Sequence, residues 1–140
     1  MPTQEETKAL LRFALKMEPA LGLHGLGYNL SSKGSQPPLN AENKRHLLEI
    51  AQAALFLSSV NKRKSINKSI CSSELKGMVE RWLWHNVDVG ATYITNLHIA
   101  NGCFIAAAIG LGFSYTGDDN PFINVSSVSV KRLVNRCFQT

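Results

Sequence analysis

One stretch of the sequence, residues 97–109, constrains the fold more than any other. Its part from Phe104 to Ile109 is entirely apolar, so a helix formed there would have no polar face. A helix that is apolar all round is normally buried among other elements. The stretch is also shorter than the roughly 20 residues that a membrane-spanning helix needs. We therefore expect residues 97–109 to be the central helix of a globular core, and we expect no membrane span.

Four other segments carry the pattern of amphipathic helices. The first begins at Thr3 with Glu6 three residues later, which is the spacing of a capping box, and it ends before a proline. Asn40 is a suitable cap for the second. The clearest helical period, with apolar residues at i, i+3, i+4, i+7 and i+8, runs from Leu75 to Leu83. The four predicted helices cover about residues 3–18, 40–59, 72–86 and 127–138.

The segment between the central helix and the last helix has a different pattern. Apolar and polar residues alternate on both sides of a turn-forming cluster at residues 117–121, which predicts a short β-hairpin over residues 113–125. A single hairpin is marginally stable alone, so it should pack against the helices. The predicted fold class is therefore α-rich α+β, with about five helices around the apolar central helix at residues 97–109 and one short β-hairpin at residues 113–125.

The length of 140 residues fits a single globular domain covering residues 1–140. Hydrophobic residues make up 44% and charged residues 18%, which is the balance of a chain with a packed core. Residues 20–40 are rich in glycine and proline and predict a long loop, in which we expect residues 31–38 to be mobile. The polar, acidic N-terminal residues do not resemble a secretory signal. The three cysteines are dispersed and odd in number, so we expect reduced thiols and a cytoplasmic location.

The sequence shows no recognisable catalytic or metal-binding motif. The four histidines are scattered without an HxxxH or HExxH spacing, and neither a GxSxG motif nor a P-loop motif is present. Residues 22–27 have the glycine order GxxGxG and follow a predicted helix, so we interpret them as a turn rather than a phosphate loop. We therefore expect no metal, no cofactor and no enzymatic activity.

Basic residues are concentrated in two segments. Fifteen Lys and Arg against ten Asp and Glu give a net charge of +5. Residues 61–76 hold five of these cations with one acid, and residues 129–140 hold three cations with none. If both segments lie on one face, they form a footprint for a phosphate backbone; otherwise they are solubilising charge on several faces. The candidate residues for binding nucleic acid or another acidic partner are Lys62, Arg63, Lys64, Lys68, Lys131, Arg132 and Arg136.

Two aromatic residues, Tyr28 and Trp84, are candidates for contact with a partner. Tyr28 lies in the long loop that is rich in glycine. Trp84 lies off the apolar stripe of its predicted helix, whereas Trp82 lies on the stripe and should pack in the core. An exposed Trp84 could serve a foreign partner or a homodimer, and the sequence leaves both open.

The segment from Val125 to Asn135 is similar to the recognition helix of the lactose-repressor class of helix-turn-helix proteins. In both, a small polar cap starts the helix, and an Arg and an Asn follow in the next turns, here Arg132 and Asn135. The resemblance covers eleven residues and implies a helix that reads DNA. That class places another helix directly before the recognition helix, whereas the preceding residues here predict a hairpin that contains Pro121.

A second resemblance covers about half of the chain, residues 65–126. It is carried by four strings, Ser72-Ser73-Glu74-Leu75-Lys76, Tyr93-Ile94-Thr95-Asn96, Asn101-Gly102-Cys103-Phe104-Ile105 and Asn120-Pro121-Phe122-Ile123-Asn124. These strings resemble small accessory proteins of phages and conjugative elements. In those proteins the Asn-Gly string follows the Tyr string more directly, so residues 97–101 would lengthen the start of the central helix here. The resemblance implies a mobile-element setting, in which small proteins often bind DNA or inhibit host defence.

These features predict a small, basic, non-enzymatic binding module that contacts nucleic acid, above all DNA, through its Lys and Arg segments. The alternative is a phage- or plasmid-type inhibitor of a bacterial defence complex such as CRISPR, which would act by protein–protein contact. Mimicry of DNA is not expected of a basic chain. The expected partner is therefore a nucleic acid, a protein or a protein–nucleic acid complex, and not a membrane.

Overall fold

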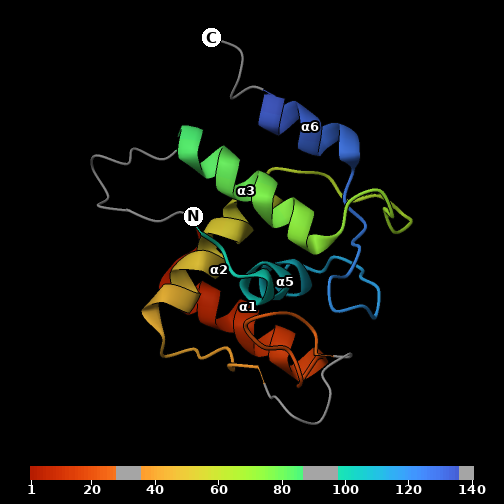
Figure 1. The fold of residues 1–140 in the computed structure, drawn as a ribbon. Helices are drawn as coiled ribbons and strands as arrows, with labels where there is room; N and C mark the ends of the chain where they lie inside the picture. The colour runs from red at the N-terminus through yellow and green to blue at the C-terminus, as the bar shows by residue number, and fades with distance from the viewer. Residues whose placement is uncertain (28–35, 87–97, 136–140) are drawn as a thin grey trace.

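The computed structural model describes residues 1–27, 36–86 and 98–135 (Figure 1). These ranges contain five α-helices: α1 (Gln4–Met17), α2 (Lys44–Leu57), α3 (Ser72–Asn86), α5 (Asn101–Gly110) and α6 (Ser127–Asn135). The same ranges contain no β-sheet, because their strand-like pairings are isolated bridges. The predicted helical character of the chain is confirmed. None of the helices described is long and apolar enough to cross a membrane.

The starts of the first two helices are set by side chains that accept backbone hydrogen bonds. Thr3 and Glu6 form the predicted capping box, since each side chain accepts the backbone N–H of the other at 3.1 Å. The second helix begins later than a cap at Asn40 would place it. Asn43 is the cap of α2 and accepts two N–H groups of its first turn. Asn40 instead accepts the N–H of Glu42 at 2.8 Å, which closes a turn before the helix.

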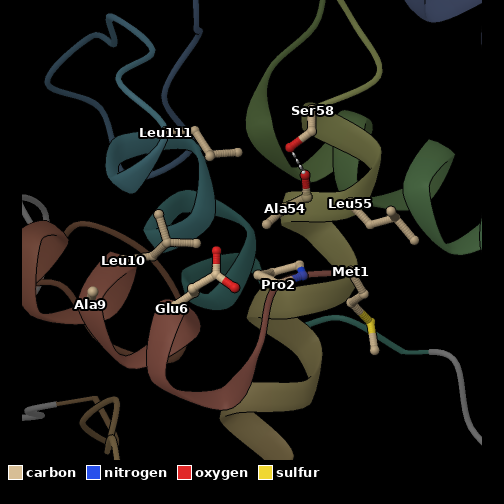
Figure 2. A pocket seen from close by; sticks show the side chains of 9 residues that line it. All are labelled: Met1, Pro2, Glu6, Ala9, Leu10, Ala54, Leu55, Ser58 and Leu111. Carbon is tan, nitrogen blue, oxygen red and sulfur yellow. Dashed lines mark hydrogen bonds between the residues drawn. The ribbon is translucent and has the colours of Figure 1, made fainter.

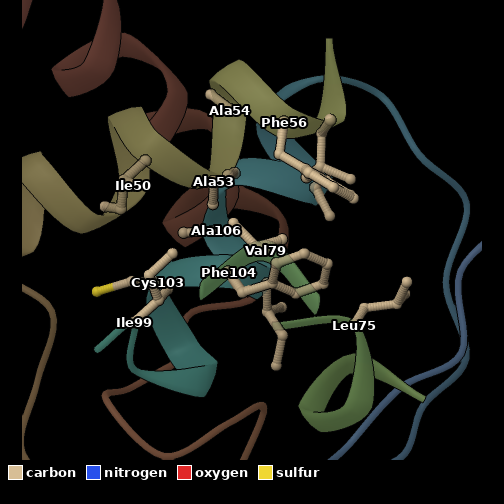
Figure 3. Packing of buried hydrophobic residues seen from close by; sticks show 14 of the residues in the cluster. Ile50, Ala53, Ala54, Phe56, Leu75, Val79, Ile99, Cys103, Phe104 and Ala106 are labelled. Atoms are coloured by element: carbon tan, nitrogen blue, oxygen red, sulfur yellow. The ribbon is translucent and has the colours of Figure 1, made fainter. Parts of the chain in front are cut away.

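Helix α5 packs against α1, α2 and α3, and its residues from Asn101 to Ile109 are all buried. Figure 3 shows Cys103 and Phe104 of α5 among apolar side chains of α2 and α3. Small residues allow the close approach, because a Cβ on Gly110 would lie 2.8 Å from the Leu10 side chain of α1. The first residue of the predicted helix 97–109, Leu97, lies outside the described residues, and α5 begins at Asn101.

The predicted β-hairpin over residues 113–125 is not present as a pair of strands. A single antiparallel bridge joins Tyr115 to Ile123. Next to this bridge, the Asn124 side chain takes the place of a strand partner, because its carbonyl oxygen accepts the N–H of Ser114 at 2.8 Å. Residues 113–125, with their alternating pattern, therefore form a loop that one β-bridge closes, and not two paired strands.

The second half of that loop, residues 121–126, is held from its other side by residues 61–72. Four main-chain hydrogen bonds cross between them: Arg63 N–H to Asn124 O (2.7 Å), Asn67 N–H to Ile123 O (2.9 Å), Ser72 N–H to Pro121 O (2.9 Å) and Ser126 N–H to Asn61 O (2.8 Å). The sharing diverts one hairpin bond, because the Asn124 carbonyl accepts the N–H of Arg63 and the N–H of Ser114 is left to the Asn124 side chain. The backbone of residues 121–126 divides its hydrogen bonds between two neighbours far apart in the sequence.

The glycine-rich loop is held by Gln36. The Gln36 side-chain oxygen accepts the N–H groups of His24 and Gly25 at 2.6 and 3.1 Å, and its amide nitrogen donates to the carbonyls of Ala20 and Gly25. Residues 31–35 of the segment predicted to be mobile lie outside the described residues. The turn predicted at residues 22–27 is present, and it packs on the start of α5, where Gly102 donates its N–H to the carbonyl of Leu23.

Candidate nucleic-acid interface

The basic loop, which we define as residues 61–68, lies against the first turn of α6. The N–H of Asn61 donates to the hydroxyl of Ser129 at 3.0 Å, although these residues are 68 positions apart. In return, the carbonyl of Asn61 accepts the N–H of Ser126 at 2.8 Å. The two segments in which the sequence concentrates its cations are therefore neighbours in the structure.

Asn67 attaches the other end of the basic loop to the same turn. Its side chain is buried, and its amide nitrogen donates to the carbonyl of Val125 at 2.9 Å and to the hydroxyl of Ser127. Its amide oxygen accepts the N–H of Ser69 at 3.0 Å. Lys64 lies midway between the two attachments. Three residues of extended chain span about 10 Å at most, so its backbone stays close to the start of α6.

Helix α6 has one buried side and one exposed side. Val130 and Val134 are buried, and α6 contacts α3. The residues at i, i+3, i+4 and i+7 on the opposite side are all exposed, and this spacing places them in one stripe. We call it the α6 stripe, and it consists of Val128, Lys131, Arg132 and Asn135.

The cations of this region differ in how they are held. The ammonium group of Lys62 donates to the carbonyl of Leu111, at the C-terminal end of α5, at 2.8 Å, and it lies 5.1 Å from the centre of the Phe113 ring. Arg63 donates to the hydroxyl of Ser65 at 3.0 Å. Lys62 and Arg63 are therefore partly engaged by their own loop and its neighbours, although both residues are exposed.

Lys76 of the first segment pairs with Glu80 at 3.6 Å, whereas the four remaining candidate cations described in the two segments are exposed. Among the described residues, no carboxylate lies within 4.0 Å of a side-chain nitrogen of these cations. They are Lys64 and Lys68 of the loop and Lys131 and Arg132 of α6, and all four are exposed. Their charge is not neutralised locally, so it can attract an acidic partner. Arg136, the last cation predicted for this site, lies outside the described residues.

The two tryptophans of α3 have opposite environments. Trp82 is 8% exposed and meets Phe56 of α2 edge to face, with ring centres 5.4 Å apart. Trp84 is 64% exposed. The apolar period of the helix therefore predicted correctly that Trp82 is buried and that Trp84 is exposed. Tyr28, the other aromatic residue predicted to contact a partner, lies outside the described residues.

Two carboxylates at the start of α5 are a polar cluster that the sequence did not reveal. The N-cap of α5 is Ala100, which has no side-chain oxygen to accept a hydrogen bond. Glu49 of α2 accepts the N–H of Ala100 at 2.6 Å, and Glu80 of α3 accepts the N–H of Ile99 at 2.7 Å. Arg45 pairs with Glu49 at 2.9 Å. This cluster accepts the N–H groups of the two residues that precede α5 and places negative charge near the positive end of the helix dipole. The only sequence signal was an acid among the apolar positions of the second helix.

The two described cysteines lie in different environments. Burial raises the pKa of Cys103, and the nearby Glu49 carboxylate raises it further, so this residue stays a protonated thiol. Cys71 is half-buried and contacts the Glu74 carboxylate at 3.3 Å. Cys137 lies outside the described residues. The part of the chain that the structure describes also holds no group of three or more His, Cys, Asp or Glu side chains that could bind a metal ion.

A groove lies where α1, α2 and the end of α5 meet (Figure 2). It has a volume of about 550 Å³ and is lined mainly by apolar side chains, including Leu10, Leu55 and Leu111. Its polar groups are already bonded, because the Ser58 hydroxyl donates to the Ala54 carbonyl at 2.7 Å and Glu6 belongs to the capping box. The groove contains no arrangement of side chains that suggests a reaction.

Comparison with known proteins identified no relative, since no family model, curated sequence or solved structure matches the chain. The resemblance of residues 65–126 to accessory proteins of phages and conjugative elements stays a prediction.

Proposed function

We propose that this protein is a non-enzymatic binding module that contacts nucleic acid, and DNA above all, through the basic loop and α6. The observation that carries the proposal is the double attachment of the basic loop to the first turn of α6 by Asn61 and Asn67. The attachment makes neighbours of two cationic segments that are far apart in the sequence. Neutralisation of phosphates by such neighbouring cations is the main source of affinity in non-specific DNA binding.

The exposed cations have two different roles in this proposal, which are direct contact with phosphates and support of the loop. Lys64 and Lys68 of the loop, together with Lys131 and Arg132 of α6, would contact phosphates because no described carboxylate pairs with them. Lys62 holds the loop against the end of α5 through the Leu111 carbonyl. Lys62 and Arg63 would then add to the positive potential around the contact rather than form its centre.

The experiment that tests the proposal is a salt series with labelled single- and double-stranded DNA and RNA. The variant is Lys64→Ala with Lys68→Ala. The matched control is Arg12→Ala with Lys16→Ala, which removes two exposed cations from α1. We expect binding near about 50 mM salt that weakens steeply as salt rises. We also expect the loop variant to lower the slope of log affinity against log salt by about 1 for each lost phosphate contact.

Two results would contradict the proposal. One is the absence of binding to any of the four nucleic acids near about 50 mM salt. The other is an equal loss of affinity in the loop variant and the α1 control, because this would show attraction by net charge without a defined surface. A loss confined to the loop variant supports the proposed surface.

A second candidate function is inhibition of a bacterial defence complex by protein–protein contact. The observation that favours it is the 64% exposure of Trp84 on α3, because tryptophan is enriched among the residues that dominate binding energy at interfaces. Purification of the wild type and Trp84→Ala from a bacterial host would test this function. Inhibition would be favoured if a host protein copurifies with the wild type but not with Trp84→Ala, and if the wild type binds no nucleic acid. Nucleic-acid binding unaffected by Trp84→Ala would count against it.

A further inference from the structure

Large apolar side chains are concentrated on the exposed side of α1. Five such side chains are exposed in the described part of the chain, and three of them, Met1, Phe13 and Met17, lie on α1 or just before it. The other two, Trp84 and Val128, are on two separate helices. Single exposed apolar residues are common on protein surfaces, but a group of neighbouring ones marks a contact surface.

Phe13 and Met17 continue the wall of the groove between α1 and α2. Figure 2 shows Ala9 and Leu10 of α1 on one side of this groove and Leu55 of α2 on the other. Ala9, Phe13 and Met17 are exposed and follow one another at i, i+4 and i+8, so they lie along one side of the helix. The groove and this row form one apolar surface. We define it as the α1 face, which consists of Ala9, Leu10, Phe13, Met17 and Leu55.

The charges of α1 make this face complementary to a second copy of itself. Glu5 and Glu6 are in the first turn of the helix, and Lys16 is in its last turn. In a two-fold symmetric contact, residue i of one copy meets residue j of the other, and j meets i. An antiparallel pair of α1 helices therefore places the acidic end of each copy against the basic end of the other. A parallel pair would place like charges together at both ends.

The apolar side chains are complementary in size in the same arrangement. When Glu5 of one copy lies opposite Lys16 of the other, Phe13 lies close to Ala9 of the second copy, because the two helices run in opposite directions. Phe13 is 47% exposed and large, whereas the alanine on the groove wall is small. Large side chains opposite small ones allow two surfaces to interdigitate. The groove of each copy can therefore take the Phe13 ring of the other.

We propose that the α1 face joins two copies of this chain in an antiparallel, two-fold symmetric dimer, with Phe13 of each copy in the groove of the other. The inference goes beyond the proposed function and does not depend on it. Figure 1 shows α6 towards one end of the molecule and α1 towards the other. A dimer through α1 therefore leaves α6 and the basic loop that is attached to it exposed on both copies.

Sedimentation velocity over a range of protein concentrations measures the association. The α1 face is small and has charged edges, so we expect a dimer with a Kd of about 1–100 μM. Phe13→Ala should raise this Kd by about 10-fold or more, because aromatic anchors dominate the binding energy of an interface. The matched control is Trp84→Ala, which removes an exposed aromatic ring from α3 and should leave the Kd unchanged.

Charge reversal tests the antiparallel arrangement. Glu5→Lys and Lys16→Glu should each raise the Kd by about 10-fold or more, because each places like charges opposite one another in both halves of the contact. An equimolar mixture of the two variants should associate again, since the mixed dimer has one native pair and one reversed pair. A loss of folding in either variant would not be repaired by mixing, so the mixture separates the contact from effects on stability.

Three results would overturn the inference. The first is a wild type that stays monomeric at concentrations up to about 1 mM. The second is a dimer that Trp84→Ala weakens as much as Phe13→Ala does, because the contact is then not centred on the α1 face. The third is a mixture of Glu5→Lys and Lys16→Glu that does not associate, which excludes the antiparallel pair. Nucleic-acid binding is measured separately, so the proposed function and the dimer stand or fail independently.

Discussion

The side-chain amide of Asn67 donates a hydrogen bond to the main-chain carbonyl of Val125, 58 positions later in the chain, at 2.9 Å. The same nitrogen donates to Ser127, and the amide oxygen accepts the N–H of Ser69. Asn67 is 1% exposed and Val125 is 0% exposed, so the bond between them is shielded from water. One buried side chain thus joins the basic loop to the start of α6 and determines where the cations of the loop lie.

Asn67→Ala should lower the free energy of unfolding by about 1–3 kcal/mol, because it leaves the carbonyl of the buried Val125 without this hydrogen bond. Urea denaturation measures the change. Asn61→Ala is the control, because Asn61 attaches the loop through its main chain, and the substitution should cost less than about 0.5 kcal/mol. Equal losses in the two variants would show that the side chain of Asn67 has no special part in holding the loop.

Two helical glycines should respond in opposite ways to alanine. A Cβ at Gly102 of α5 would lie 1.8 Å from the carbonyl oxygen of Gly22, a backbone atom that cannot rotate away. Gly102→Ala should therefore destabilise the protein by about 1–3 kcal/mol or more, since the loop must shift. A Cβ at Gly77 of α3 has no neighbour within 4 Å.

Gly77→Ala should instead stabilise the protein by up to about 1 kcal/mol, because alanine has the higher helix propensity. Thermal denaturation of both variants beside the wild type measures the difference, and about 1 kcal/mol corresponds to a few degrees for a chain of this size. A Gly102→Ala variant that melts with the wild type would contradict the close packing of the loop on α5.

Features that depend on neighbouring residues could be predicted from the sequence. The capping box of Thr3 and Glu6 and the helical period from Leu75 to Leu83 each lie within one helix, and the structure contains both α1 and α3 where they indicated. The opposite environments of Trp82 and Trp84 follow from the same period. Local spacing is sufficient in these cases because the partners are at most one or two turns apart.

Features that depend on distant residues could not be predicted. The hairpin predicted over residues 113–125 is not shown as two strands: one bridge joins Tyr115 to Ile123, and the distant Arg63 takes the Asn124 carbonyl. The cap at Asn40 was wrong because Asn43 competes for the same helix start. For the candidate site, composition identified the cations, but their proximity depends on contacts of Asn61 and Asn67 with α6, more than 55 positions away.

The two tryptophans of α3 should differ sharply in their contribution to stability. Trp82→Ala removes a buried ring that packs against Phe56, so we expect a loss of about 3–5 kcal/mol in the free energy of unfolding. Trp84→Ala should change it by less than about 0.5 kcal/mol, since most of the ring is in solvent. Acrylamide should quench the fluorescence of the wild type partly and that of Trp84→Ala hardly at all. A large loss of stability in Trp84→Ala would place this ring in the core and remove it as a contact residue.

The carboxylate of Glu6 should make the stability of α1 depend on pH. Hydrogen bonds from the main chain of Thr3, and then from its side chain, lower the pKa of Glu6 below its ordinary value of 4.5. A carboxylate whose pKa is lower in the folded protein contributes stability above the ordinary value, and that contribution is lost as the pH falls through the lowered pKa. At neutral pH the full contribution is present.

We therefore expect Glu6→Gln to be less stable than the wild type at pH 7, and we expect the difference to disappear on acidification below the pKa of the folded protein. Urea denaturation at a series of pH values measures the difference, and NMR titration of the Glu6 side chain gives the pKa directly. Glu5→Gln has the same change of charge in the same helical turn without the bond to Thr3, so it controls for interaction with the helix dipole. A titration midpoint of Glu6 at or above 4.5 would contradict the capping box as the cause.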